Sequence, residues 1–212
     1  MADSLRSQLD KRLARLKSER DSNWLPEWRE LSDFIMPRAG RFNTSDVNQG
    51  KRRDKKIINP RASFAARTLA AGMHSGMTSP ASPWFKLGTP DPGLMQYGPV
   101  KEWLYAVEKA MREVMARSNL YNVLPTVYGE EGVFGTAAMA ALPDEHDTVR
   151  FYPFTVGSYM IANSDRGQVD TLYREFRMTA RQLEQQFGKA AMSITAQALL
   201  TSNSEAWIDV CH

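Results

Sequence analysis

The spacing of hydrophobic residues changes near Gly132, and this change constrains the fold more than any other feature of the 212-residue chain. Before Gly132, hydrophobic residues recur every three or four positions, which is typical of helices that bury one face. After it, short runs of alternating residues are separated by turn-rich clusters, which is typical of strands joined by hairpins. The sequence therefore predicts an α+β fold, in which about five N-terminal helices pack on an antiparallel sheet of hairpins.

Residues 1–22 are predicted to form an amphipathic N-terminal arm. Leu5, Leu9, Leu13 and Leu16 share one stripe of a helix whose other faces are rich in Lys and Arg. The polar residues at 21–23 are expected to end this helix. Such a helix can lie on the core of its own chain as a solvated surface helix, or it can dock on a neighbouring subunit, and the sequence leaves both possibilities open.

Residues 23–130 are predicted to be mainly helical and to contain a basic loop at 38–56. Helices are expected to begin at Pro26, at Pro60 behind the capping residue Asn59, at Pro99, and after a second capping residue, Asn119. The helix that begins at Pro99 carries a stripe that we expect to be buried in the core. This stripe consists of Val100, Trp103, Leu104, Val107, Met111, Val114 and Met115.

The segment 69–85, with the sequence LAAGMHSGMTSPASPWF, joins an Ala, Gly and Met helix to a proline-rich turn. A helix face made of small residues and flexible thioethers can approach another backbone closely. Pro80 and Pro83 are expected to end the helix, so that Trp84, Phe85 and Leu87 form a short strand. A buried core helix explains the same pattern. The residues that we nominate for a subunit interface are Leu69, Gly72, Met73, Gly76, Met77, Trp84 and Phe85.

Residues 131–212 are predicted to form an antiparallel β/α region. Thr179 and Gln182 form a capping box at the start of a helix that Gly188 ends. An alternating strand at 207–210 then stops at His212 without a turn, so we expect this region to be truncated at its C-terminal end. Four earlier strands are predicted at 136–142, 149–154, 158–162 and 169–178.

The positive charge of the chain lies in its N-terminal quarter. Residues 1–60 contain 14 Lys and Arg against 9 Asp and Glu, whereas the remaining residues contain 13 against 15. Because no aromatic residue alternates with the basic cluster in the loop 38–56, only sequence-independent contact with nucleic-acid phosphates would be expected there. A solvated turn and an inter-subunit salt bridge are the alternatives. The cluster consists of Lys51, Arg52, Arg53, Lys55 and Lys56.

The sequence offers no foundation for an enzyme. It lacks a phosphate-binding glycine loop, a metalloprotease helix and a nucleophile elbow, so we expect no catalytic residue, cofactor or metal. His74 is interpreted as a core or interface imidazole, and a hydrolase built around it is the alternative. The single cysteine, Cys211, excludes a disulfide within the chain. A membrane span is not expected, because the longest nearly apolar run, at 132–142, is too short.

Three segments, in the same order, resemble the bacteriophage head-to-tail connecting protein family, the portal proteins of short-tailed phages. They are the segment 69–85, the segment 131–142 with the sequence EGVFGTAAMAAL, and the segment 154–188, which is similar to that family's succession of strand, turn, strand and helix. The resemblance runs from about Trp24 to the end of the chain. It implies a portal wing-like fold and the N-terminal part of a longer portal protein.

The resemblance also implies a structural role. Portal subunits form a ring, implied to be a dodecamer, at one vertex of the capsid, through which double-stranded DNA is packaged and ejected. The implied partners are further copies of the chain, capsid and tail-adaptor proteins, the terminase and DNA in transit, with no membrane. The implied location is the virion, after assembly in the host cytoplasm. A non-specific nucleic-acid-binding module that uses the loop 51–56 is the alternative function.

Overall fold

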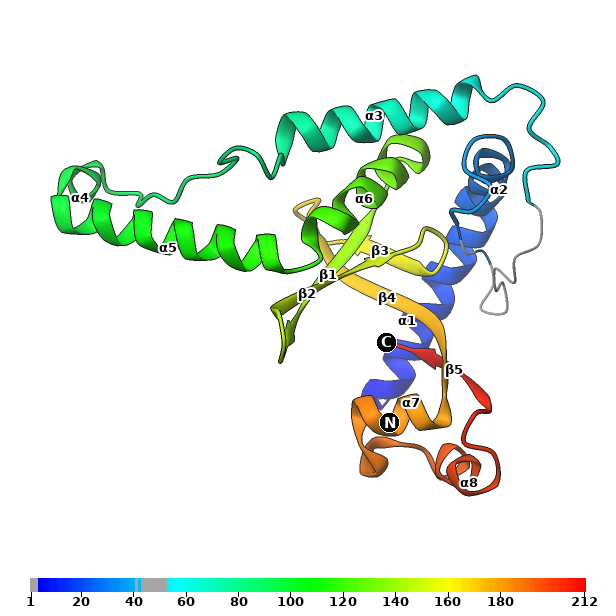
Figure 1. Cartoon of the computed structure of the whole chain (residues 1–212). Helices are drawn as coiled ribbons and strands as arrows, with labels where there is room; N and C mark the ends of the chain where they lie inside the picture. Colours follow the sequence, from blue (N-terminus) through cyan, green and yellow to red (C-terminus); the bar gives the residue numbers. More distant parts are fainter. Residues whose placement is uncertain (1–3, 41, 43–52) are drawn as a thin grey trace. The chain divides into compact units, whose positions relative to one another are not determined.

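The computed structural model describes residues 4–40, 42 and 53–212 (Figure 1). The α+β class predicted from the sequence is confirmed, with helices first and antiparallel strands after them. The chain divides into two compact units. Unit 1 comprises Met1–Asp33, Pro37–Lys56 and Thr155–His212, and unit 2 comprises Phe34–Met36 and Ile57–Phe154.

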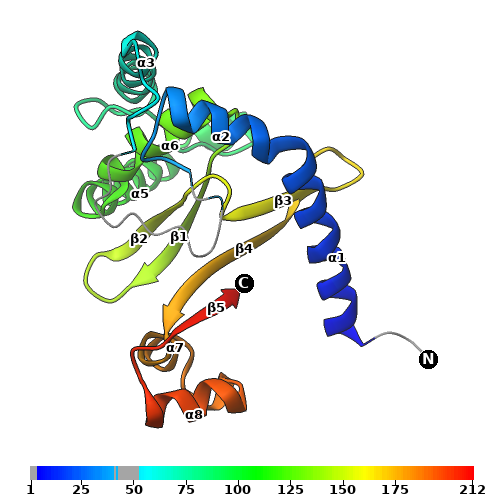
Figure 2. The same ribbon diagram turned by 90° about the vertical axis from the view of Figure 1, so that its right-hand side faces the viewer.

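Unit 1 begins with two helices joined without a break. Helix α1 (Leu5–Glu19) passes into a π-helical turn (Arg20–Trp24), which leads into α2 (Leu25–Phe34). The expectation that residues 21–23 end the helix is wrong. The backbone N–H of Leu25 donates to the carbonyl oxygen of Arg20, so helical hydrogen bonding continues with a wider turn. Figure 2 shows the chain changing direction at this turn.

The sheet of unit 1 has the order β3-β4-β5 and is antiparallel throughout (Figure 2). Thr179 closes the long strand β4, and the capping box that it forms with Gln182 is confirmed at the start of α7. Tyr159 and Met160 are buried at the start of β3, and Val156, which precedes the strand, is buried too. The elements are β3 (Tyr159–Asn163), β4 (Val169–Thr179), α7 (Ala180–Phe187), the 3-10 turn η2 (Lys189–Ala191), α8 (Ile194–Ser202) and β5 (Trp207–Cys211).

Unit 2 is built around α3 (Arg61–Met77) and α6 (Leu120–Phe134), which lie against each other (Figure 1). A hairpin of β1 (Ala138–Asp144) and β2 (Thr148–Phe154) packs on α6 through β2. Gly135 ends α6 with φ of 72°, a left-handed conformation that glycine adopts without strain. The core cluster consists of Ala70, Leu120, Leu124 and Tyr128.

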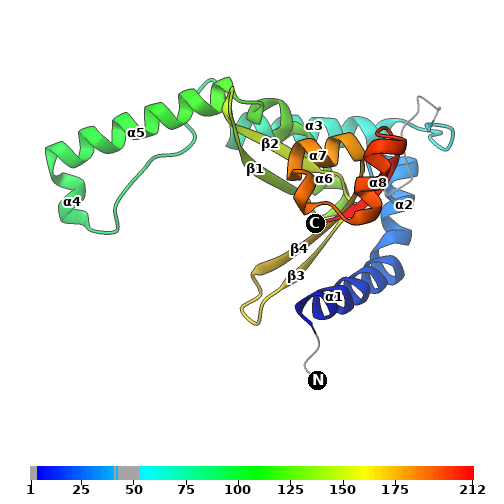
Figure 3. The same ribbon diagram turned by 90° about the horizontal axis from the view of Figure 1, so that it is seen from below.

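The remaining part of unit 2 is a helical hairpin. A loop leaves α3 and reaches the short helix α4 (Pro92–Gln96). The long helix α5 (Gly98–Arg117) then leads back from α4 to α6 (Figure 3). Residues 84–87, all of which are described, form no strand, so that expectation is wrong. Their aromatic side chains instead pack on neighbours: the ring of Trp84 meets that of Phe85 edge to face, at 4.9 Å between centroids.

Helix α5 differs from its prediction in which side chains it buries. Leu104 is buried as expected, but Trp103, predicted to lie in the core, is 63% exposed. Met111 is also exposed. Periodicity correctly places a helix here, but α5 packs on only a narrow part of α6 and β2. A helix that is covered on one side leaves the rest of a broad hydrophobic stripe in water.

Candidate functional site

The face that α3 turns toward α6 is packed tightly. Ala70 is buried there, and Met73 packs against the core cluster. The close approach depends on glycines of α6 and not on those of α3. A Cβ at Gly132 would lie 2.7 Å from Cδ2 of Leu69, and one at Gly129 would lie 3.9 Å from the Cβ of Ala70. A Cβ at position 132 would require the Leu69 side chain to move, whereas one at position 129 would make ordinary van der Waals contact with Ala70.

The opposite face of α3 is open. A Cβ placed at Gly72 or Gly76 would meet no atom of the described residues within 4 Å. Phe64, Leu69 and Met77 are large hydrophobic side chains that remain exposed along this helix. These side chains and the open glycines leave part of α3 accessible to a partner.

The C-terminal end of α3 is fixed by a chain of side-chain hydrogen bonds. His74 Nδ1 lies 3.3 Å from Thr78 Oγ1, which lies 3.0 Å from the hydroxyl of Tyr128. The imidazole also lies beside the ring of Tyr121, at 6.1 Å between centroids. These contacts account for His74 as a packed residue, since the Thr78 hydroxyl beside it is buried and bonded to Tyr128.

Trp84 and Phe85, in the segment after α3, are also packed against their own chain. Trp84 Nε1 donates to the hydroxyl of Tyr121 at 3.1 Å, so a half-buried indole finds the partner that its N–H requires. Trp84 and Phe85 are therefore half-buried against their own chain. Four of the residues nominated for an interface are exposed: Leu69, Gly72, Gly76 and Met77. The other three, Met73, Trp84 and Phe85, are partly buried.

The basic cluster of the loop is described only in part. Lys51 and Arg52 lie outside the described residues, Arg53 is half-buried, and Lys55 is exposed. Lys56 Nζ lies 2.6 Å from Oδ2 of Asp33, which neutralises one of the described cations. An ion pair of this kind, at the surface, contributes little to stability.

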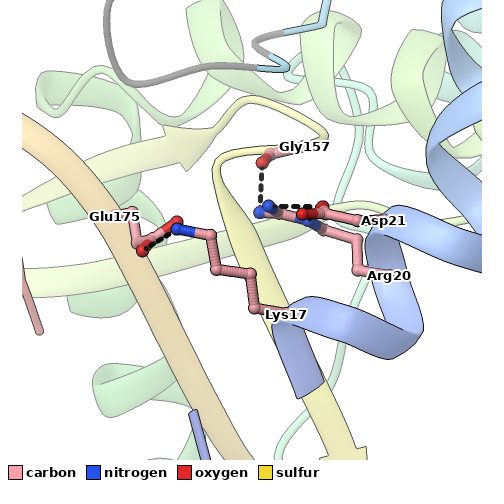
Figure 4. A network of polar contacts seen from close by, with 5 residues as sticks. All are labelled: Lys17, Arg20, Asp21, Gly157 and Glu175. Carbon is pink, nitrogen blue, oxygen red and sulfur yellow. Dashed lines mark hydrogen bonds and ion pairs between the residues drawn. The ribbon is translucent and has the colours of Figure 1, made fainter. Parts of the chain in front are cut away.

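The N-terminal helix is held on unit 1 by a polar network that the sequence did not indicate (Figure 4). Lys17 Nζ pairs with Oε1 of Glu175 on β4 at 2.8 Å. Arg20 is only 6% exposed, and its guanidinium donates to the carbonyl oxygen of Gly157 at 2.8 Å while it pairs with Asp21 at 2.7 Å. Because a buried guanidinium needs partners for its N–H groups, these contacts fix the end of α1.

The leucine stripe of α1 is less buried than an amphipathic pattern suggests. Within α1, all of whose residues are described, no side chain is fully buried, and Leu5 and Leu9 are exposed. The hydroxyl of Tyr173 donates to the carbonyl oxygen of Leu9 at 3.3 Å, and Arg12 lies 3.6 Å from Asp170. The helix therefore lies along β3 and β4 through polar contacts and keeps its N-terminal leucines in water.

Two ionisable groups have displaced pKa values. The backbone N–H groups of Asp147 and His146 donate to Asp144 and lower the pKa of its carboxyl. Burial raises the pKa of the Cys211 thiol, and the nearby carboxylates of Glu175 and Asp10 raise it further. Neither group has a catalytic partner in these contacts. Asp144 stabilises a hairpin turn, and Cys211 is kept in its less reactive thiol form.

In the described ranges, 4–40, 42 and 53–212, no three His, Cys, Asp or Glu side chains are grouped so that they could hold a metal ion. None of the described helices has both the length and the apolar character that crossing a bilayer requires.

One surface was missed by sequence reasoning. The hairpin of α4 and α5 exposes Leu94, Tyr97, Trp103 and Tyr105. The sequence signal was a pair of aromatic residues two positions apart: Trp103 and Tyr105 point to different sides of the helix and cannot both face one narrow partner. Exposed aromatic side chains are typical of surfaces that bind another protein.

Comparison with known proteins identifies the family. The model of the family described as bacteriophage head to tail connecting protein matches residues 6–212. The portal protein of Salmonella phage epsilon15 is 51% identical over 213 residues, which cover all of this chain and 38% of the phage protein. The probable portal protein of Bordetella phage BPP-1 is 44% identical over 208 residues, which cover 98% of this chain and 37% of that protein. The chain thus spans well under half the length of these relatives, and it belongs to the bacteriophage head to tail connecting protein family.

Proposed function

We propose that this chain is part of the subunit of a phage portal, a ring at one capsid vertex through which double-stranded DNA is packaged and ejected. The observation that carries the proposal is the identity of 51% with a portal protein over the whole chain. The proposed partners are other copies of the chain, capsid and tail-adaptor proteins, the terminase, and DNA in transit. The proposed location is the junction of head and tail in the virion.

The surface of the chain supports an assembly role. A closed ring is built from heterologous contacts, so each subunit must present two different patches that complement each other. The outer face of α3, with its open glycines Gly72 and Gly76, is one such patch. Its open glycines leave space for a neighbouring chain, as Gly132 of α6 leaves space for the side chain of Leu69 within unit 2.

The charge of the chain suits passage of DNA better than its retention. The net charge is only +3, and the basic residues are concentrated in the first 60 positions. A protein that neutralises many phosphates binds DNA tightly and in a salt-dependent way. We therefore propose that the ring guides DNA through few persistent contacts.

The proposal is tested by introducing a stop codon into the gene in the phage genome that encodes this chain. Particles produced without the protein are expected to be heads that lack packaged DNA, and supplying the protein from a plasmid is expected to restore filled heads. Electron microscopy and protection of encapsidated DNA from nuclease measure the outcome. Filled heads in the absence of the protein would contradict the proposal.

A further inference from the structure

The helix α1 receives little of the hydrophobic burial that stabilises the rest of unit 1. Within α1, all of whose residues are described, no side chain is fully buried, and Leu13 and Leu16 are half-buried. The strand β3, by contrast, buries Tyr159 and Met160. Because burial of apolar surface is the largest favourable contribution to folding, α1 is attached less firmly than the strands beneath it.

Polar contacts with water access join α1 to β4. Lys17 Nζ lies 2.8 Å from Oε1 of Glu175, and the lysine side chain is 46% exposed (Figure 4). Arg12 lies 3.6 Å from Asp170, and both side chains are about half exposed. Ion pairs of this kind contribute little to stability, and dissolved salt screens them. The attachment of α1 therefore depends on ionic strength.

The C-terminal end of α1 is held differently. Arg20, which follows the helix, is buried, and its guanidinium donates to the carbonyl oxygen of Gly157 and pairs with Asp21 (Figure 4). A buried and paired guanidinium is costly to release. The helix itself has 15 residues, and an isolated helix of that length is only marginally stable in water. The weakly held segment therefore ends at Glu19.

We infer that α1 is a strap that opens from β3 and β4 as a separate unit, while Arg20 keeps its C-terminal end in place. Opening uncovers the half-buried pair Leu13 and Leu16. Leu5 and Leu9 are exposed already, so the complete leucine stripe is accessible only in the open state. Because ion pairs hold the closed state, ionic strength sets the populations of the two states. The inference concerns unit 1 alone and does not depend on the proposed ring.

Hydrogen exchange measured by mass spectrometry on the unassembled complete gene product tests the inference, because local opening sets the exchange rate of a protected N–H group. The backbone N–H groups of residues 9–19 are expected to exchange at least about tenfold faster than those of β4 in the same sample. Raising the salt concentration to about 1 M, where the screening length is about 3 Å, is expected to increase that ratio about threefold. Equal rates in α1 and β4, or a ratio that salt leaves unchanged, would overturn the inference.

A reversal of charges tests the ion pair itself. Lys17→Glu and Glu175→Lys are each expected to speed exchange in α1 about threefold, and the double variant K17E/E175K is expected to restore the wild-type rate. Arg15→Glu makes the same change of charge at an exposed position of α1 and is the matched control, with an expected change below about twofold. If Arg15→Glu acts as strongly as Lys17→Glu, or if the double variant does not restore the rate, the inference is wrong.

Failure of this inference is distinguishable from failure of the proposed function. Rings formed by a protein whose α1 exchanges as slowly as β4 would refute the strap and leave the ring standing. A protein that forms no ring, but whose α1 exchanges rapidly and responds to salt, would refute the proposed function and support the strap. Exchange in β4 serves in each variant as the check that unit 1 is folded.

Discussion

The side chain of Asn119 and the backbone of Phe151 close a ring of two hydrogen bonds. Asn119 Nδ2 donates to the carbonyl oxygen of Phe151 at 2.7 Å, and the N–H of Phe151 donates to Asn119 Oδ1 at 2.8 Å. The amide side chain therefore substitutes for a neighbouring strand and attaches β2 to the start of α6. No other uncharged side chain has both a donor and an acceptor in this arrangement except Gln.

Replacing Asn119 is expected to destabilise unit 2. Asn119→Ala leaves both backbone groups of Phe151 without these partners, and we expect it to reduce the free energy of unfolding by about 2–3 kcal/mol. Asn119→Asp is a more specific test. It keeps the shape of the side chain but removes the N–H donor and places a negative charge against the carbonyl oxygen of Phe151. Urea denaturation measures both. An Asp variant as stable as the wild type at pH 7 would contradict the role of the donor.

Replacing Arg20 is expected to loosen the N-terminal helix of unit 1. Arg20→Met keeps much of the hydrophobic contact but removes the hydrogen bond to the carbonyl oxygen of Gly157, and we expect a loss of about 1–3 kcal/mol. Arg15→Ala, at an exposed position of α1, is the control and is expected to change stability by no more than about 0.5 kcal/mol. Equal stability of the two variants would show that the contacts of Arg20 do not stabilise the N-terminal helix.

Replacing Gly72, on the open face of α3, is expected to raise the stability of the unassembled chain and to weaken the assembly of the ring. Gly72→Ala is expected to stabilise the unassembled chain by about 0.5–1 kcal/mol, because Ala favours a helix interior and a Cβ there meets no described atom within 4 Å. It is expected to weaken ring assembly by crowding the face. Gly135→Ala is the contrast, since φ of 72° makes Ala destabilising there. Thermal unfolding and sedimentation measure the two properties separately.

The hairpin turn at Asp144 predicts a dependence of stability on pH. The N–H groups of His146 and Asp147 donate to Asp144 Oδ1 at 2.9 and 2.8 Å, which lowers the pKa of the carboxyl below its usual 3.8. Because the folded pKa is depressed, the contribution of the carboxylate is present above about pH 3.8 and is lost as the pH falls through the folded pKa.

Asp144→Asn keeps an acceptor but cannot titrate, so the difference in stability between wild type and variant is expected to shrink as the pH is lowered from 5 toward 2. Urea unfolding at a series of pH values measures this difference. A difference that stays constant over the whole range would show that the ionised carboxylate contributes nothing.

Local patterns predicted most elements but not which surfaces they cover. The capping box of Thr179 and the helix that begins near Pro60 depend on neighbouring residues alone, and both are found in the structure. Asn119 was expected to cap its own helix, yet its side chain bonds to Phe151, 32 residues away. A short polar side chain suits both roles, and only tertiary contact decides between them.

Tertiary contacts also explain the other differences between the predicted and the observed structure. Residues 21–23 are poor helix formers, but Arg20 is buried and bonds to Gly157 and Asp21, and these contacts favour a continuous helix over a break. Trp103 fits the periodicity of a buried stripe, and no local pattern shows how much of α5 its neighbours cover. The patch proposed for assembly lies on α3, and the sequence alone indicated it.

The central claim is that this chain is a wedge of a closed ring, and the mass of the assembled particle tests it most directly. Mass photometry of the complete gene product, followed by electron microscopy of the same sample, is expected to show one large species whose mass is a fixed multiple of the subunit and whose images are closed annuli. A single species at the mass of one subunit, unchanged at the highest attainable concentration, would contradict the account.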